Sequence, residues 1–179
     1  MIYQYYNLGK GNLGKNHLMD KNRRSKLLLA YGLWKEAGII SPKIIRNSFG
    51  KPMIKDHSTL FISSTHSESS SALMISNRRV GIDLERIRPY REVAAKRVLN
   101  SEELENLSKK QDRDVGFFQL FTLKESYIKA LGCGFAYPVK KLSFYVDPKG
   151  RIQSNRPHAS FYQREDSMGF LLSICLLKK

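Results

Sequence analysis

Two carboxylates stand two positions apart in the segment Gly81-Ile82-Asp83-Leu84-Glu85. Apolar residues alternate with them, and this period of two predicts a β-strand whose side chains point alternately to its two faces. Asp83 and Glu85 therefore share one face, while the other face points to the core and carries Val80, Ile82 and Leu84. Adjacent carboxylates repel each other, so a buried pair needs a cation, and such oxygen ligands suit Mg²⁺. On this spacing alone, a solvent-exposed strand face is the better interpretation.

A second group of charged residues lies on a helix predicted over residues 115–131, which Gly132 and Gly134 should end. Glu125 and Lys129, four positions apart, lie on one side of it, and Lys124 lies at the boundary. The opposite side forms an apolar arc of Leu120, Leu123, Tyr127, Ala130 and Leu131. A Glu–Lys pair is common on helix surfaces, but this helix is apolar enough to be central. Next to the acidic strand it would give three acids and two bases, which suits a metal-bound pyrophosphate.

Two further segments carry donors for phosphate oxygens. Gly50-Lys51-Pro52 precedes a strand whose far end reads Thr65-His66-Ser67. A strand end rich in hydroxyls and imidazole can donate hydrogen bonds to phosphate. Taken alone, His66 is more simply a histidine of a surface loop.

The predicted elements fall into two halves, each with a long helix and a small, mostly antiparallel sheet. A buried helix is expected over 25–34, ending near Gly38, and Ser101 is expected to cap a helix in the second half. Residues 77–79 should turn the chain and make a hairpin of the strands at 72–75 and 80–85. The other expected elements are a strand at 60–62, a helix at 91–99, and strands at 142–146, 151–153, 159–163 and 170–177. The fold class predicted is α+β.

The composition is that of a globular protein with an excess of basic residues. The 179 residues carry 31 Lys and Arg against 16 Asp and Glu, a net charge of +15. Such a surface attracts polyanions and acidic proteins, although a lysine-rich genome would explain much of the excess equally well. Residues 1–14 lack the apolar stretch of a signal peptide, and no apolar run is long enough to span a bilayer. With two cysteines at no metal-binding spacing, a cytoplasmic protein is expected.

Taken together, the four segments resemble motifs of the surfactin-type branch of the 4′-phosphopantetheinyl transferase superfamily. Gly50-Lys51-Pro52 resembles its GKP segment, and Thr65-His66-Ser67 resembles its SHS segment, with threonine for the first serine. Residues 80–85 resemble (V/I)G(V/I)D(I/V)E, and residues 121–129 resemble (W/F)(S/C/T)xKE(S/A)xxK. Each match is weak alone, whereas all four in order between Gly50 and about residue 140 are specific.

The resemblance implies a fold of two similar halves, residues 1–85 and 86–179, in one monomer with the active site between them. It implies transfer of 4′-phosphopantetheine from coenzyme A to a serine of an acidic acyl or peptidyl carrier protein, releasing adenosine 3′,5′-bisphosphate. Nucleic acid and membrane are not expected as partners. The metal would be Mg²⁺, with Mn²⁺ able to substitute, held by Asp83, Glu85 and Glu125.

The resemblance also implies roles for individual residues. Glu125 is a candidate base for the carrier serine, either directly or through a metal-bound water, and Lys129 is a candidate to assist the leaving phosphate. In the implied contacts to coenzyme A, Arg23 or Arg24 lies near the 3′-phosphate, and Lys51 and Pro52 lie against the adenine. Thr65 and His66 lie near the pyrophosphate, and Lys124 and Lys129 bind phosphate groups.

Two other classes of protein remain possible on the sequence. A two-metal nuclease would also need clustered acids, a lysine and a basic surface, but such sites often pair Glu and Lys on a strand, and here they lie on a helix. A nucleic-acid-binding module without catalysis is supported by the charge alone. The sequence shows no helix-turn-helix, zinc or aromatic RNA-binding pattern that would add to it.

Overall fold

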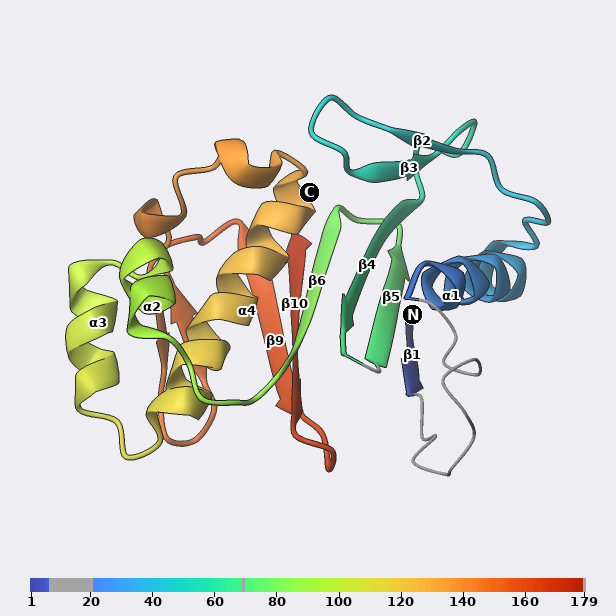
Figure 1. The fold of residues 1–179 in the computed structure, drawn as a ribbon. Coiled ribbons are helices and arrows are strands. Elements are labelled where there is room, and N and C mark those ends of the chain that lie inside the picture. The colour runs from blue at the N-terminus through green and yellow to red at the C-terminus, as the bar shows by residue number, and fades with distance from the viewer. Residues whose placement is uncertain (7–20, 69, 179) are drawn as a thin grey trace, which may run out of the picture.

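Two three-stranded antiparallel sheets lie side by side at the centre of the computed structural model, which describes residues 1–6, 21–68 and 70–178 (Figure 1). The segment 1–14 discussed above therefore falls largely outside the described residues. One sheet has the order β1-β5-β4, with β1 at Ile2–Tyr6, β5 at Ser70–Ser76 and β4 at Phe61–Ser67. The other has the order β6-β10-β9, with β6 at Val80–Arg86, β10 at Phe170–Leu177 and β9 at Ala159–Glu165. The predicted α+β class is confirmed.

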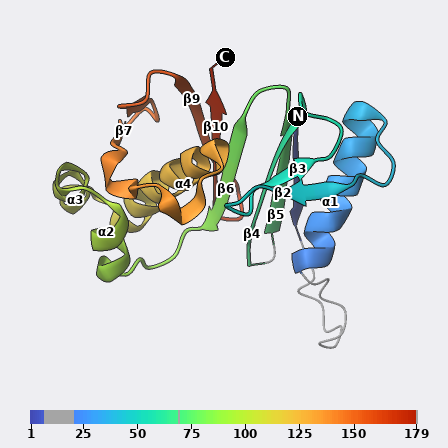
Figure 2. The ribbon, with the colours of Figure 1, turned by 90° about the horizontal axis from the view of Figure 1, so that it is seen from above.

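Each sheet is covered on its outer side by one long helix. Helix α1 (Lys21–Ala37) packs on β5, and helix α4 (Arg113–Leu131) packs on β6 and β10. Seen from above, α4, the two sheets and α1 follow one another across the molecule (Figure 2). Two shorter helices, α2 (Glu92–Val98) and α3 (Ser101–Ser108), lie beyond α4, and two short 3-10 helices, η1 (Gly134–Ala136) and η2 (Val139–Lys141), follow α4 in the chain. Two small hairpins are β2–β3 (Ile44–Arg46, Pro52–Ile54) and β7–β8 (Phe144–Val146, Ile152–Ser154).

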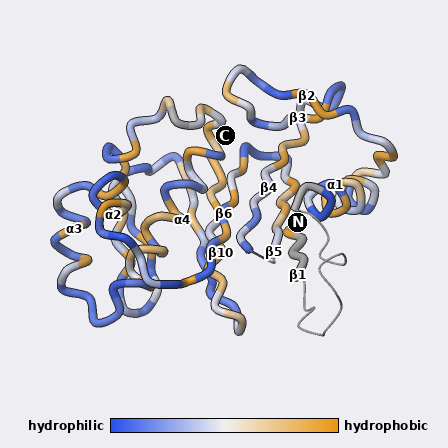
Figure 3. Tube along the Cα trace, in the orientation of Figure 1, coloured by the Kyte–Doolittle hydropathy of each residue, from blue (hydrophilic) through white to orange (hydrophobic). Residues whose placement is uncertain are grey.

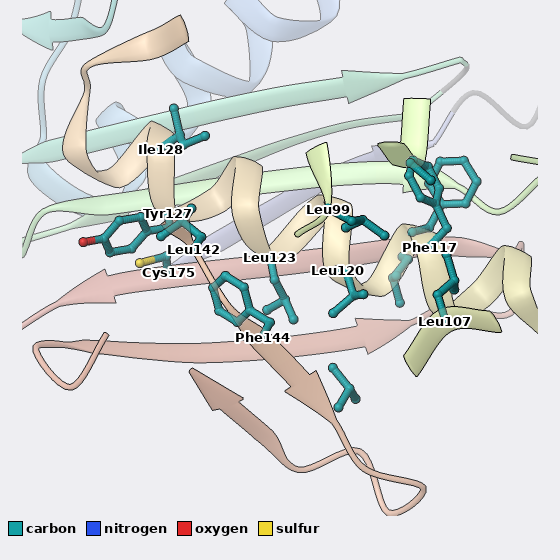
Figure 4. Packing of buried hydrophobic residues seen from close by; sticks show 14 of the residues in the cluster. Leu99, Leu107, Phe117, Leu120, Leu123, Tyr127, Ile128, Leu142, Phe144 and Cys175 are labelled. Atoms are coloured by element: carbon teal, nitrogen blue, oxygen red, sulfur yellow. The ribbon is translucent and has the colours of Figure 1, made fainter. Parts of the chain in front are cut away.

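The core has three parts that follow these layers. The largest lies between α4, the β10–β9 side of the second sheet and the β7–β8 hairpin, and includes Leu123, Phe144 and Cys175 (Figure 4). A second lies between the two sheets, where β6 buries the face predicted to be apolar: Val80, Ile82 and Leu84. The third lies under α1, around Leu33 and Leu73. In Figure 3, hydrophobic residues alternate with hydrophilic ones along β6, whereas hydrophilic residues predominate on α3.

Gly81 allows α4 to lie directly against β6. A Cβ atom at this position would overlap the carbonyl oxygen of Ser126 and the backbone nitrogen of Ala130. Because the helix and the strand approach so closely, the face of β6 that carries Asp83 and Glu85 is held near the face of α4 that carries Glu125 and Lys129.

Hydroxyl side chains of β4 join the two sheets along the line between β4 and β6. Ser63 accepts from the backbone nitrogen of Ile82 at 3.1 Å, and Ser67 accepts from that of Arg86 at 3.2 Å. Thr65 lies between them and donates to the Asp83 carboxylate at 3.2 Å. The period of two along β4 places all three hydroxyls on one side of the strand.

Three local predictions were wrong. Strands β5 and β6 do not form a hairpin: β5 pairs with β4, and β6 pairs with β10, because both faces of β6 are buried between layers. Helix α1 is not buried all round, since Leu27, Tyr31 and Trp34 are exposed. Helix α3 is capped by Asn100 instead of Ser101, in a capping box with Glu103.

The hydrogen bonds of β6 also bear on where the two halves divide. β6 (Val80–Arg86) belongs to the second sheet, because it pairs with β10. The expected division after residue 85 falls within this strand, and the boundary at 85/86 remains a prediction. In the described part of the chain, no helix has the length and apolar character needed to cross a membrane.

Candidate active site

Asp83 lies at the centre of a charged cluster between β4, β6 and α4. Its side chain is buried, and its Oδ1 atom accepts from Lys129 Nζ at 2.6 Å and from Thr65 Oγ1 at 3.2 Å. Lys129 Nζ also donates to Thr65 Oγ1 at 3.2 Å. The other carboxylate oxygen, Oδ2, is buried and has no hydrogen-bond partner among the described residues. A buried unpartnered carboxylate oxygen is costly unless a ligand satisfies it.

Glu85 lies further along the same face of β6. It accepts hydrogen bonds from Ser67 Oγ at 3.1 Å and from Arg88 Nη1 at 3.0 Å, both on Oε2. Burial raises the pKa of Glu85, and the charge of Asp83 raises it further, whereas Arg88 and Ser67 lower it. Asp83 and Glu85 project to the same face of β6, as predicted, because they bond to Thr65 and Ser67 on one side of β4.

Glu125 brings a third carboxylate to this cluster from α4. Burial raises the pKa of Glu125, the charge of Asp83 and, more weakly, that of Glu85 raise it too, and Lys129 lowers it. Glu125 and Lys129 both line a cavity of about 570 Å³ that also borders the β2–β3 turn, the end of α2 and the segment after α4. Glu125 and Lys129 therefore connect the acidic cluster to the cavity, because the Lys129 ammonium also pairs with Asp83.

The chemistry of these donors fits a magnesium ion. Within the described ranges, no three His, Cys, Asp or Glu side chains are grouped so that they could hold a metal ion by themselves. Mg²⁺ does not require such a group, since it is usually bound by one or two carboxylates with substrate phosphates and waters as further ligands. A bound cation would give the Oδ2 atom of Asp83 a partner. It would also lower the raised pKa values of Glu85 and Glu125, because it stabilises their charged forms.

Lys124 is not brought to this cluster, and here the structure corrects the prediction. Its ammonium is buried and pairs with Glu103 at 2.6 Å. It also donates to the carbonyl oxygens of Val98, Val139 and Leu142. Burial lowers the pKa of Lys124, while Glu103 raises it. The side chain turns inward because α2, α3 and the segment after α4 cover this side of the helix.

The residues expected around coenzyme A are spread over several elements. Lys51 and Pro52 line the cavity together with Glu125 and Lys129. Arg24 is buried and donates to Glu68 O at 2.8 Å and Ser71 Oγ at 3.3 Å, whereas Arg23 is exposed. His66 is exposed on β4, opposite Ser71. The structure thus joins Lys51, Pro52 and Lys129 in one cavity, whereas Arg24 lies on α1 and is bound to Glu68 and Ser71 next to it.

Some residues of the site were missed from the sequence. Arg88 binds Glu85, and Arg46 and Arg97 line the cavity beside Glu125. Ser67 was part of the predicted donor segment, but its bond to the Glu85 carboxylate was not predicted. The period-two hydroxyls of residues 63–67 could have predicted a polar strand face. The arginines carry no signal of this kind, because their approach to the cavity depends on tertiary packing.

Comparison with known proteins assigns the family. The family model of the 4′-phosphopantetheinyl transferase superfamily matches residues 79–175, which include the acidic strand and the whole of α4. The chain therefore belongs to the 4′-phosphopantetheinyl transferase superfamily, as its motifs predicted. The alternatives of a nuclease and a nucleic-acid-binding domain find no support in these matches.

Individual relatives agree with the surfactin-type branch. The chain is 35% identical over 139 residues to the 4′-phosphopantetheinyl transferase gsp of Aneurinibacillus migulanus, covering 74% of this chain and 57% of that protein. It is 28% identical over 133 residues to the 4′-phosphopantetheinyl transferase Sfp of Bacillus subtilis, covering 71% of this chain and 59% of that protein. The match thus spans less than two thirds of either relative. Among solved structures, the holo-[acyl-carrier-protein] synthase of Thermotoga maritima superposes on 56% of this chain and 62% of that chain, with 24% identity and a TM-score of 0.48.

Proposed function

We propose that this protein transfers the 4′-phosphopantetheine group of coenzyme A to a serine hydroxyl of an acyl or peptidyl carrier protein, with release of adenosine 3′,5′-bisphosphate. The observation that carries the proposal is the Asp83–Lys129–Thr65 cluster with its unpartnered carboxylate oxygen beside two further acids. Asp83, Lys129 and the two further acids lie in the part of the chain that matches the family model, and Thr65 precedes it. Related transferases of the surfactin type carry this activity in their names.

The metal in this proposal is Mg²⁺, for which Mn²⁺ would substitute. Asp83, through its free Oδ2 atom, Glu85 and Glu125 would hold it. When bound, it would neutralise charge on the pyrophosphate, the main requirement of a phosphoryl transfer.

The chain's own residues have separate tasks in this proposal. Glu125 lines the cavity next to Lys129, where its carboxylate would accept the proton of the carrier serine. Lys129 is a partly exposed cation at the edge of the cavity and would donate to the leaving phosphate. Thr65 holds Lys129 and Asp83 in a fixed relation, because its hydroxyl contacts both. Such fixed positioning is the main catalytic contribution that a protein makes to phosphoryl transfer.

Coenzyme A would enter the 570 Å³ cavity with its adenine against the segment Lys51–Pro52. Thr65 and His66 would lie along the pyrophosphate, and Arg23 or Arg24 near the 3′-phosphate. The net charge of +15 suits an acidic carrier protein. We further propose a monomer that works in the cytoplasm, with its halves divided at residues 85/86 and its site between them.

Mass spectrometry tests this function. An apo carrier protein is incubated with this protein, coenzyme A and Mg²⁺, with and without EDTA. The expected result is a mass gain of one phosphopantetheine group, about 340 Da from its formula, that EDTA abolishes by removing the metal. No gain with several acyl and peptidyl carriers, together with no binding of coenzyme A in a calorimeter, would contradict the proposal.

A further inference from the structure

The β2–β3 turn supplies hydrogen-bond donors to the end of α4. The last carbonyl groups of a helix have no partners within the helix. Here, Lys51 Nζ donates to Lys129 O at 2.7 Å and to Ala130 O at 3.0 Å, and Asn47 Nδ2 donates to Gly132 O at 2.8 Å. The same ammonium donates to Val80 O, at the start of β6, at 3.1 Å. An element remote in sequence thus caps the helix that carries Glu125 and Lys129.

The turn is built to hold this position. Asn47 Oδ1 accepts from the backbone nitrogens of Phe49 and Lys51, at 3.0 Å and 2.9 Å. Asn47 N also bonds to Lys51 O at 3.1 Å, and Gly50 takes a left-handed φ of 85° that closes the turn. Asn47 therefore fixes the backbone of Lys51 as well as binding Gly132.

The helix end is fitted to the turn in the same way. Gly132 ends α4 with a φ of 75°, and a Cβ atom there would come within 2.6 Å of Lys51 Cδ. A positive charge at this end also interacts favourably with the helix dipole. Figure 1 shows the β2–β3 hairpin reaching from the first half of the molecule to the end of α4. Packing, charge and hydrogen bonds therefore all point to one contact between the halves.

We infer that Asn47 and Lys51 are positioning residues that act on Lys129 through the last turn of α4. Lys51 Nζ bonds to the carbonyl of Lys129 itself, and the Lys129 side chain contacts Asp83 and Thr65. The Lys51 ammonium, engaged with three carbonyls, serves the protein and not the nucleotide. Its aliphatic stem and Pro52 remain to line the cavity. The segment proposed to meet the adenine is thereby coupled to the helix proposed to act on the phosphate.

The test separates positioning from substrate binding, and its kinetic part rests on the proposed function. Lys51→Met, Asn47→Ala and Lys51→Arg are compared with Lys43→Met, an exposed control before β2 that does not line the cavity. We expect kcat to fall at least about tenfold in Lys51→Met and about threefold in Asn47→Ala. The KM for coenzyme A should stay within about twofold, and Lys51→Arg should recover part of kcat. A raised KM with unchanged kcat would make Lys51 a nucleotide ligand and overturn the inference.

A second readout does not depend on transfer activity. Hydrogen exchange of the amides at 126–131 should accelerate in Lys51→Met and Asn47→Ala and stay as in the wild type in Lys43→Met. If the wild type transfers nothing, the proposed function fails, while the exchange rates still decide whether the turn stabilises the helix end. Unchanged exchange in both variants would overturn the inference. If Lys51→Met does not fold, the kinetic constants and the exchange rates of Asn47→Ala decide instead.

Discussion

Two lysines on successive turns of α4 have opposite surroundings. Lys124 and its partner Glu103 are each 1% exposed, and three carbonyl oxygens complete the contacts of the ammonium. Glu103 in turn accepts from the backbone nitrogens of Asn100 and Phe144. Lys129 is 32% exposed and pairs with Asp83, which keeps one buried oxygen without a partner in the described part of the chain.

The difference indicates what each face of the helix does. The Lys124 face is a polar network with its charges satisfied inside the protein, and it ties α2, α3 and the segment after α4 to the helix. On the Lys129 face, the pKa values of Glu85 and Glu125 are raised. Glu125 and Lys129 also line an open cavity there. Satisfied networks stabilise a fold, whereas unsatisfied charged groups in a cavity indicate a ligand.

The largest expected effect concerns the stability of the Lys124 face. Lys124→Met leaves the Glu103 carboxylate buried without its cation, so the free energy of unfolding should fall by about 3–5 kcal/mol. Adding Glu103→Gln should recover part of this loss, because it removes the unpaired charge, while its single amide oxygen can accept from only one of the two backbone nitrogens that Glu103 binds. Chemical denaturation measures both values. The exposed pair of Lys109 with Glu105 is the control, and Lys109→Met should leave the midpoint unchanged. Equal losses in Lys124→Met and the double variant would mean that packing, and not the ion pair, matters here.

On the Lys129 face, activity should be lost while stability is kept. Asp83→Asn removes the charge that the proposed metal needs, so the transfer rate should fall at least about 100-fold. The free energy of unfolding should change by less than about 1 kcal/mol, since the amide fits the same space. Transfer is followed by mass spectrometry and stability by thermal unfolding. If Asp83→Asn lowers the free energy of unfolding strongly and leaves the transfer rate unchanged, the prediction is contradicted. The Lys129 face would then contribute to stability and not to activity.

Magnesium and pH should act together on the same face. Burial and the charge of Asp83 raise the pKa of Glu125 and Glu85. A carboxyl group whose pKa is higher in the folded than in the unfolded protein stabilises the fold at pH values below its pKa in the unfolded protein. This contribution is lost as the pH rises through its pKa in the folded protein. In EDTA, raising the pH from about 5 to about 7.5 should therefore cost wild type more stability than Glu125→Gln.

Mg²⁺ should offset this loss at neutral pH, by about 2.7 kcal/mol at a hundred times its Kd, and should do little in acid where the carboxyls are protonated. Thermal unfolding at several pH values measures both trends. An equal rise in Tm for wild type and Asp83→Asn would count against the site.

The smallest effect concerns the hydroxyl that joins the two halves. Thr65→Val keeps the shape but removes the hydrogen bonds to Asp83 and Lys129. We expect a decrease in kcat of about three- to tenfold, because both of the lost hydrogen bonds are long and each contributes little. Thr65→Ser, which restores the hydroxyl, should match the wild type. Steady-state kinetics decide, and a Thr65→Ser variant as slow as Thr65→Val would assign the role to the methyl group.

The sequence predicted the parts of the site that follow a regular period. The alternation in residues 80–85 placed Asp83 and Glu85 on one face, and the helical period placed Glu125 and Lys129 together. It failed for Lys124, because an amphipathic pattern does not show that α2 and α3 cover that side of α4. The pairing of β6 with β10 was also missed, since strands so far apart in sequence are joined by tertiary packing that no local signal specifies. The contacts of Lys51 with α4 depend on the same long-range packing.

Direct titration of magnesium tests the central claim, that the unsatisfied acids of the Lys129 face form a metal site. Isothermal titration calorimetry would be carried out with coenzyme A present, on the wild type, on Asp83→Asn, and on Lys124→Met combined with Glu103→Gln. The account predicts one magnesium site in the wild type, none in Asp83→Asn, and an unchanged site in the double variant. Equal binding by wild type and Asp83→Asn would contradict it, because the metal would then lie elsewhere.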